Sequence, residues 1–549
     1  MTKAVPIVDL FSGPGGLAEG FAAFRRPNGR QGYHVALSIE KDEAAYRTLR
    51  LRAFLRKFED GFPSEYYDFL NGMTSGEPNW AELYPKHWAA ACEETRFMEL
   101  GKRNTRKFVR QRVELIRSEH GGRTVLLGGP PCQSYSVVGR SRNAGNVLYN
   151  PDRDDRQSLY KEYAYVLRRL KPVVAVMENV KGMLSARHNG KRIFANVMRA
   201  LARRSGSNCY RLFALASRSG ARSWNEGALP KDFVVHAEAH RVPQTRHRVF
   251  VVCIRDDIAS TLPMELLPRL EPHDHTVSLE DIIGSMPRLR CRLSRCDSPD
   301  SWRAAVRRAH DLVKTNPPVM SPDEENRFHR ALESALAATD QVAPPCRNSR
   351  GGMDLARHCP RELRNWLLDK NLEALPNNET RAHIPDDLAR YLFVVAFGQT
   401  FGRSPKTSDF PEALVPPHAS WRTGKFDDRY RVQLPDCPCT TVTSHLSKDG
   451  HYFIHPDPSQ VRSLTVREVA RLQTFPDNYF FHGTRTEQYV QVGNAVPPFL
   501  AWQLARVVWA VLDHHDDVRS RQGHSVSGHS VPRSVHQGKP LPLVAMETT

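Results

Sequence analysis

A cysteine in a polar segment that two prolines stiffen is the first candidate for chemistry in this chain. Cys132 lies within Gly128–Arg140, directly after Pro130 and Pro131. A lone cysteine is more often a buried packing residue, but the glutamine, serines and arginine that follow make surroundings unsuited to a core thiol. The apolar run over 123–128 predicts a buried strand. Because ligands bind at the carboxyl edge of open α/β sheets, we predict that Cys132 is a nucleophile.

Two further predicted strands bring polar side chains to the same edge. Glu178 and Asn179 end an apolar run, and such a pair at the end of a strand points to a site. Arg246 and Arg248 enter the strand over 249–254, and their alternation places both side chains on one face. Two guanidiniums on one face suit an anionic or carbonyl-rich ligand, although a solvent-facing pair is an equally good interpretation.

A glycine-rich turn near residue 13 predicts an adenosine-cofactor site. Gly13, Gly15 and Ala18 follow a strand pattern and match the Gly-x-Gly-x-x-Gly/Ala spacing. Glu40 ends the next strand, where a carboxylate can accept hydrogen bonds from ribose hydroxyls. Nicotinamide, flavin and S-adenosylmethionine enzymes share this pattern, and glycines also make tight turns with no ligand. The cofactor's identity therefore stays open at this point.

The elements that must position these residues alternate between strand and helix, which predicts a parallel sheet. Phe97-Met-Glu-Leu-Gly is a candidate third strand. Glu99 would then meet the adenine of the cofactor, with Asp68 as the other candidate, although an ordinary surface carboxylate is the commoner case.

The alternation of predicted strands and helices is absent over about 256–435, where the chain becomes rich in proline and arginine. We expect a separate basic lobe there. Basic residues interleaved with Trp302 and Trp421 fit contact with nucleic acid, although a charged helix face is the commoner explanation of any single run. The tail from 516 is rich in serine, histidine and proline, and we predict that it is disordered.

Amino-acid composition limits the possible binding partners and the cellular compartment of the protein. The formal net charge of +18 favours a polyanionic partner, with nucleic acid as the leading candidate. Ten cysteines in 549 residues, with no signal-like start and no long apolar run, predict a soluble protein of a reducing compartment, in contact with no membrane. The pairs Cys437 with Cys439 and Cys291 with Cys296 lack zinc-site spacing, so we predict no metal.

Five motifs in a fixed order carry a resemblance to a known family: Asp9-Leu-Phe-Ser-Gly-Pro-Gly-Gly, Gly129-Pro-Pro-Cys-Gln-Ser-Tyr-Ser, Glu178-Asn-Val, Gln244-Thr-Arg-His-Arg and Gly493-Asn-Ala-Val-Pro-Pro. Over about 5–250 and 437–510 the chain closely resembles the DNA cytosine-5 methyltransferases. The resemblance implies an α/β fold in which a doubly wound, Rossmann-like sheet binds S-adenosylmethionine and carries an inserted, mixed target-recognition domain. The expected domains are 1–255 and 437–515 for catalysis, 256–436 for recognition and 516–549 for the tail.

The resemblance also implies a role for each matching residue. Cys132 would attack C6 of a flipped-out cytosine in duplex DNA, and elimination after methylation at C5 would release it. The residues expected to act on the base are Cys132, Glu178, Arg246 and Arg248. The cofactor set is Phe11, Ser12, Pro14, Gly16, Glu40, Glu99, Pro131, Asn494, Ala495 and Val496, and the DNA contacts are Gln133, Ser136, Arg140 and Thr441.

Other functions stay open from the sequence. The same fold methylates cytosine in tRNA, and a non-catalytic DNA-binding regulator could keep it. We expect a cytoplasmic, nucleoid-associated enzyme that is monomeric on DNA and protects host DNA, with companion restriction or phage-defence proteins. A regulatory system is an alternative, and the recognition sequence, the base-reading residues of the lobe and the acceptor of the C5 proton are hidden at this level.

Overall fold

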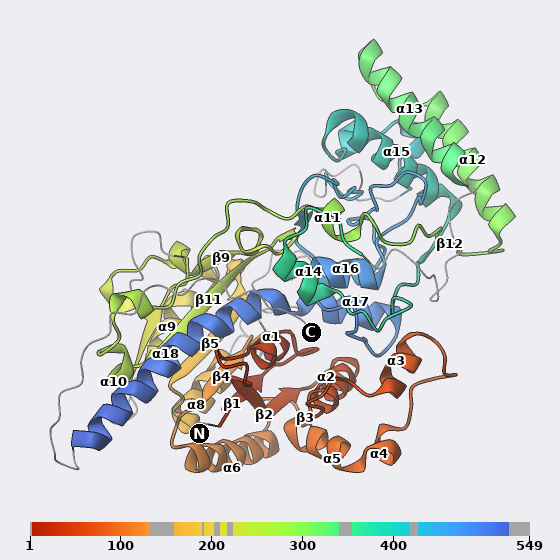
Figure 1. The fold of residues 1–549 in the computed structure, drawn as a ribbon. Coiled ribbons are helices and arrows are strands. Elements are labelled where there is room, and N and C mark those ends of the chain that lie inside the picture. Colours follow the sequence, from red (N-terminus) through yellow and green to blue (C-terminus); the bar gives the residue numbers. More distant parts are fainter. Residues whose placement is uncertain are drawn as a thin grey trace.

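The computed structural model describes residues 3–131, 159–188, 191–202, 209–216, 223–339, 354–417, 421 and 427–525. Cys132, Gln133, Ser136 and Arg140, for which the sequence predicts roles, lie outside these residues. The described part holds a central sheet with helices on both faces and a helical lobe beside it (Figure 1).

The central sheet has eight strands in the order β3-β2-β1-β4-β5-β11-β8, with β9 paired to β11. The first five strands of this order are parallel, as the alternating sequence pattern predicts. β11 runs antiparallel to its neighbours β5, β8 and β9, an orientation that the pattern did not predict. The strands are β1 (Val5–Leu10), β2 (Tyr33–Glu40), β3 (Thr95–Phe97), β4 (Val125–Gly128), β5 (Val174–Val180), β8 (Tyr210–Phe213), β9 (Val234–His236) and β11 (His247–Arg255).

Apolar side chains on both faces of the sheet explain its two helical layers. One face packs against α6 (Arg103–His120), α8 (Tyr160–Leu170) and α9 (Ile193–Ala202). The other face packs against α1 (Gly16–Ala23) and α18 (Pro498–Ser525), so the last described helix covers the first one. The sheet is therefore doubly wound, as predicted.

Helix α18 bears on two expectations from the sequence. It continues to Ser525, so residues 516–525 of the expected disordered tail are helical. It also belongs to the described stretch Arg485–Ser520, which is long and apolar enough to cross a membrane, although 67% of the apolar window is buried in the fold. Packing against α1 and the sheet accounts for that apolar surface.

Between β2 and β3 lies a small layer of helices. It consists of α2 (Glu43–Leu55), α3 (Ser64–Leu70), α4 (Trp80–Leu83) and α5 (Pro85–Glu94). Asp42 caps α2 by accepting a hydrogen bond from the amide of Ala45, which satisfies one of the free donors of the first turn. Aromatic side chains of these helices share one apolar cluster.

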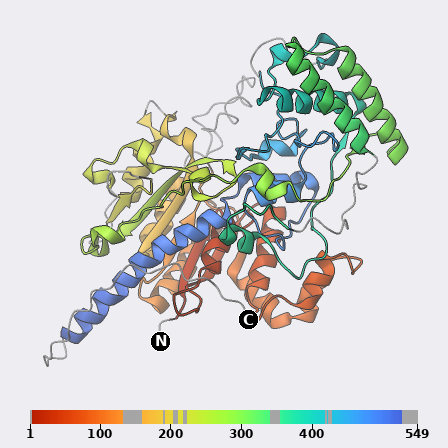
Figure 2. The same ribbon diagram turned by 45° about the horizontal axis from the view of Figure 1, so that its top comes forward.

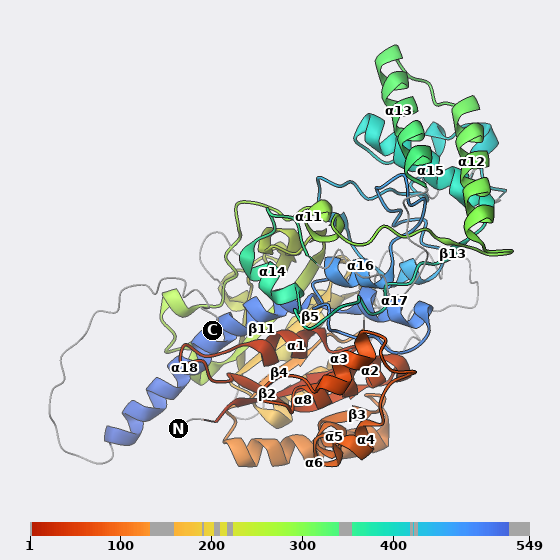
Figure 3. The ribbon, with the colours of Figure 1, turned by 45° about the vertical axis from the view of Figure 1, so that its right-hand side comes forward.

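The lobe that the sequence predicts over about 256–435 is helical, and it stands beyond one end of the sheet in all three views (Figures 1, 2 and 3). Its core joins α12 (Pro299–Thr315), α13 (Pro322–Ala338) and α15 (Pro385–Phe401). Trp302 is 1% exposed and Trp421 is 8% exposed, and both pack into this core. Both rings therefore hold the lobe together and do not contact nucleic acid, whereas contact by the basic residues around them stays a prediction.

The chain after residue 436, here called the returning chain, joins the lobe to the sheet. A further core combines α11 (Leu279–Ile283) and α14 (Arg361–Leu367) with α16 (Val466–Leu472) and α17 (Arg485–Asn494). Ile454 and Val461 pack instead into the core of the lobe. Elements before the predicted boundary at residue 436 therefore pack against the returning chain, and residues after it pack into the core of the lobe.

Candidate active site

The turn that follows β1 is built around left-handed backbone. Phe11, Gly13 and Gly15 have φ angles of 57°, 56° and 100°, a region that glycine enters without cost. The amide of Ser12 donates to the carbonyl of Ile39 (3.1 Å), and the amide of Gly13 donates to the carboxylate of Glu40 (2.7 Å). The structure therefore brings the turn at Phe11 and Ser12 next to Glu40.

Close contact between α1 and the returning chain completes the other side of this turn. A Cβ at Gly16 would lie 2.2 Å from the carbonyl oxygen of Val496, so no other residue fits without moving that backbone. The hydroxyl of Tyr479 donates to the carbonyl of Pro14. Ala495 and Val496 are buried here, whereas Asn494 is exposed.

Glu40 is partly buried, and backbone amides hold its carboxylate. Its second oxygen accepts from the amides of Lys41 and Asp42, both at 2.8 Å. Burial raises the pKa of Glu40, and these hydrogen bonds oppose the rise. The amide of Met98 donates to the carbonyl of Glu40 (2.9 Å), which places Glu99 beside it, where Glu99 forms an exposed ion pair with Lys41.

This placement brings Glu99, rather than Asp68, next to Glu40. Glu99 follows β3 at the same edge of the sheet that Glu40 occupies. Asp68 lies on α3, whose Phe69 packs against Phe480 rather than against the turn after β1.

Glu178 lies beside the start of the segment that carries the predicted nucleophile. β4 and β5 pair in parallel with Gly128 opposite Met177, so Gly129 and Glu178 leave the sheet together. A Cβ at Gly129 would lie 2.9 Å from the Glu178 carboxylate. The side-chain amide of Asn179 donates to the carbonyl of Pro130 (3.1 Å), which fixes the approach to Pro131.

The carboxylate of Glu178 forms an ion pair with Arg248 at 3.2 Å, and both side chains are largely buried. Burial raises the pKa of Glu178, and the positive charges of Arg248 and Arg246 oppose the rise. A buried carboxyl of this kind holds its proton to a higher pH than an exposed one, which suits a general acid.

Arg246 does not share the position of Arg248 that the sequence predicts for it. The residue precedes β11 and is 2% exposed. Its guanidinium donates to the carbonyls of Val442 (2.7 Å), Gly493 (3.2 Å) and Ala495 (2.8 Å). Because these bonds engage both terminal nitrogens, the structure assigns Arg246 to holding the returning chain and leaves Arg248 facing Glu178.

Thr441 lies at the junction between the returning chain and the site. The two-residue strands β10 (Gln244–Thr245) and β14 (Cys439–Thr440) pair in parallel, so Thr441 follows directly. Its hydroxyl donates to the carbonyl of Thr245, one residue before Arg246. The residue is partly exposed, as a contact to DNA requires.

Sequence reasoning missed Gln473 and the state of Asp9. The amide of Gln473 donates to the carbonyls of Val492 (3.1 Å) and Ala495 (2.6 Å), and thus acts beside Arg246. Asp9 is fully buried, and burial raises its pKa to about 7. An acidic residue inside an otherwise apolar strand was the available signal for Asp9, whereas only the tertiary contacts identify Gln473.

Comparison with known proteins gives one family. The family model described as C-5 cytosine-specific DNA methylase matches residues 87–509. The type II methyltransferase M.Bpa9945I of Bacillus paralicheniformis is 28% identical over 531 residues, which cover 93% of this chain and 99% of that protein. The type II methyltransferase M.DdeI of Desulfomicrobium norvegicum is 24% identical, over 92% of this chain and 88% of that protein.

Among solved structures, the methyltransferase EhMeth of Entamoeba histolytica aligns with a TM-score of 0.40 and 12% identity. The alignment covers 93% of this chain and 99% of that one.

Proposed function

Since the chain belongs to the C-5 cytosine-specific DNA methylase family and is a DNA cytosine-5 methyltransferase of restriction-modification type, we propose that it acts through a covalent adduct between Cys132 and C6 of a flipped-out cytosine. The observation that supports this most strongly is the buried pair of Glu178 and Arg248 beside Gly129, three residues before Cys132. A proton donor for the ring and the segment that bears the nucleophile therefore share one edge of the sheet.

S-adenosylmethionine is the proposed methyl donor, and the residues around the turn after β1 fit it. The glycine backbone leaves room for a ligand to approach, and Glu40 offers a carboxylate at the end of β2 for ribose hydroxyls. The proposed pocket residues are Phe11, Ser12, Pro14, Gly16, Glu40, Glu99, Pro131, Asn494, Ala495 and Val496. When bound, this cofactor supplies an electrophilic methyl group.

In the proposed reaction, the thiolate of Cys132 forms a bond to C6 while the Glu178 carboxyl donates a hydrogen bond or its proton to N3. The electron pair of the C5–C6 double bond then becomes available at C5, which makes C5 nucleophilic. After methylation, a base takes the C5 proton, the electron pair of that C–H bond re-forms the C5–C6 double bond as the thiolate leaves C6, and any proton on N3 returns to Glu178. Arg248 holds the base carbonyl and stabilises the anionic thiolate.

Such an attack requires the base to leave the duplex, at a cost of a few kcal/mol. Thr441 lies where it can support the backbone of the flipped nucleotide. We propose Gln133, Ser136 and Arg140 as further DNA contacts and the lobe over 256–436 as the part that reads the site. Phosphate contacts by this basic chain offset the cost of flipping.

Trapping on fluorinated DNA tests the covalent step. A duplex that carries 5-fluorocytosine at the target cannot lose its C5 substituent as a proton, so a protein–DNA adduct should accumulate in the presence of S-adenosylmethionine. Cys132→Ser should form no adduct and transfer no methyl group while it still binds DNA. Cys296→Ser, at an exposed free cysteine, is the matched control and should behave like the wild type. Methyl transfer by Cys132→Ser at the wild-type rate would refute the mechanism.

We also propose that the enzyme acts as a monomer and protects host DNA in a restriction or phage-defence system with companion proteins. The similarity to type II methyltransferases over almost the whole chain supports this role. Mapping of 5-methylcytosine in cells that express the chain should reveal one recurrent sequence, and light scattering of the DNA complex should give the mass of one chain plus one duplex. Scattered methylation without a recurrent sequence would count against the protective role.

A further inference from the structure

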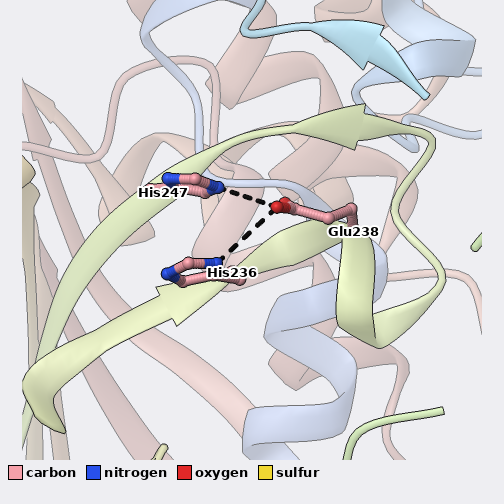
Figure 4. A group of neighbouring side chains, drawn as sticks. All are labelled: His236, Glu238 and His247. Carbon is pink, nitrogen blue, oxygen red and sulfur yellow. Dashed lines mark hydrogen bonds and ion pairs between the residues drawn. The ribbon is translucent and has the colours of Figure 1, made fainter. Parts of the chain in front are cut away.

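A cluster of two histidines and one glutamate lies where β11 begins. His247 pairs directly with His236 across the antiparallel strands β11 and β9. Side chains directly opposite each other in such a pair project from the same face of the sheet. Glu238 follows His236 by two residues and returns to this face from the turn after β9 (Figure 4). Strand pairing therefore gathers three residues that are scattered in the sequence.

The potential ligand atoms of the cluster lie within 4.8 Å of one another. Nε2 of His247 is 2.7 Å from a carboxylate oxygen of Glu238, and Nδ1 of His236 is 3.7 Å from the same oxygen. The second carboxylate oxygen of Glu238 is buried and has no hydrogen-bond partner among the described residues. One acceptor of the cluster is thus left unsatisfied beside two imidazoles, although a buried acceptor normally has a partner.

The cysteine spacings predicted no metal, but they do not bear on these residues, and we propose that His236, Glu238 and His247 bind one divalent transition-metal ion, with zinc as the best fit. Neutral imidazole nitrogens and a carboxylate oxygen are ordinary zinc ligands at about 2.0–2.2 Å. Ions such as magnesium and calcium prefer ligand sets made of oxygen alone. Three protein ligands leave a fourth position for water, and His236 is exposed enough to admit the ion from solvent.

Binding requires a local rearrangement that the cluster permits. The two imidazole rings are stacked with centroids 3.9 Å apart and an angle of 19° between their planes, so their nitrogen lone pairs lie in nearly parallel planes. A turn of the His236 ring would make the lone pairs converge on one ion. The ion would replace the hydrogen bond between His247 and Glu238, with the proton on the coordinating nitrogen moving to the other ring nitrogen or to water.

A bound ion would tie β9 to β11 next to the candidate active site. His247 lies between Arg246, which holds the returning chain, and Arg248, which pairs with Glu178. The link would therefore restrain the two arginines without contact to the base or the cofactor. Neither the family assignment nor the proposed methyl transfer requires this site, so the two can fail separately.

Cobalt(II) titration tests the site, because tetrahedral cobalt has visible absorption bands and zinc can displace it. The purified full-length chain, first stripped by a chelator, should bind one cobalt ion and lose its spectrum when zinc is added. His247→Asn and Glu238→Gln should each weaken binding by about tenfold or more, since even changes behind the ligands cost 10–100-fold. Zinc should raise the melting temperature of the wild type more than that of either variant.

The matched control is His329→Asn on α13, because His329 also lies near a glutamate and its side chain is as exposed as that of His247. This variant should bind cobalt like the wild type. Failure of the stripped wild type to bind cobalt would overturn the proposal, as would equal affinities of the wild type and His247→Asn. If one variant fails to fold without metal, the other variant, checked by circular dichroism, decides.

Discussion

At the scale of single residues, the candidate site depends on a carboxyl group that is kept from water. Glu178 is buried beside Arg248, and Gly129 leaves just enough room for its carboxylate. An uncharged amide in its place can donate a hydrogen bond but cannot deliver a proton. Substitution of Glu178 should therefore reduce the rate of methyl transfer more than it reduces the stability of the fold.

We expect Glu178→Gln to lower the single-turnover rate of methyl transfer by roughly 100-fold or more, because proton transfer by a placed side chain contributes 10²–10⁴-fold. Rapid-quench assays with labelled cofactor measure this rate. Glu362→Gln, which alters a more exposed carboxylate paired with Arg241, should leave it unchanged. A rate within twofold of the wild type would show that Glu178 supplies no proton.

Asp9 gives a prediction about stability and pH. Its pKa is raised by burial from 3.8 to about 7 in the fold, so between these values the folded state holds a proton that the unfolded state has lost. Protonated Asp9 contributes fully to the free energy of unfolding below about pH 4. This contribution falls as the pH rises, and above about pH 7 the protein has lost about 4 kcal/mol of stability relative to low pH. The contribution of Asp9 should lower the melting temperature as the pH rises from about 4 to about 7, and Asp9→Asn should reduce this fall. An unchanged pH dependence in the variant would contradict the assignment.

At the scale of elements, the sequence pattern predicted the strands that carry the site but not every contact between them. Runs of apolar residues identified β1, β2, β4, β5 and β11, because central strands are buried on both faces. The antiparallel direction of β11 could not be predicted from the sequence, because apolar periodicity does not encode the direction of a strand. Arg246 and Arg248 looked equivalent by alternation, and only the position of the carbonyls around Arg246 separates them.

The lobe shows a different limit. Trp302 stands among arginines in the sequence, which suggested contact with nucleic acid. Its helix buries one side, including Ala305, Val306 and Ala309, so Trp302 belongs to an apolar stripe at helical spacing. That stripe was readable from the sequence. The pairing of His236 with His247 was not, because it depends on the register of two strands.

The contact between α1 and the returning chain makes a second prediction about stability and binding. Gly16→Ala would place a methyl group 2.2 Å from the carbonyl of Val496 and push α1 away from that segment. We expect a loss of ~1–3 kcal/mol of unfolding free energy, as for other overpacked sites, and about tenfold weaker binding of S-adenosylmethionine. Calorimetry measures both quantities.

Gly76→Ala is the matched control for this substitution, since a Cβ at Gly76 meets nothing within 4 Å. It should change neither quantity. Wild-type affinity in Gly16→Ala would show that the cofactor does not use this side of the turn.

At the scale of the whole molecule, the formal net charge of +18 should dominate the strength of DNA binding. Proteins that make 6–10 phosphate contacts lose roughly 10³–10⁵ in affinity between 50 and 200 mM salt. We expect a loss in this range for duplex DNA, measured by fluorescence anisotropy. The affinity for S-adenosylmethionine, measured over the same salt series, should barely change. A flat response of DNA affinity to salt would exclude a binding surface dominated by phosphate contacts.

The packing of α18 on α1 has a consequence for how the protein is made. The hydroxyl of Tyr33 donates to the carbonyl of Ala505, and the two residues are 472 positions apart. At about 5–20 residues per second, α18 is synthesised some 25–90 s after β2. One face of the sheet is therefore covered by α1 but not yet by α18 on the ribosome, while the helices of the lobe, α12, α13 and α15, are already complete. The lobe can fold first, and the domain that begins earlier in the chain is finished later.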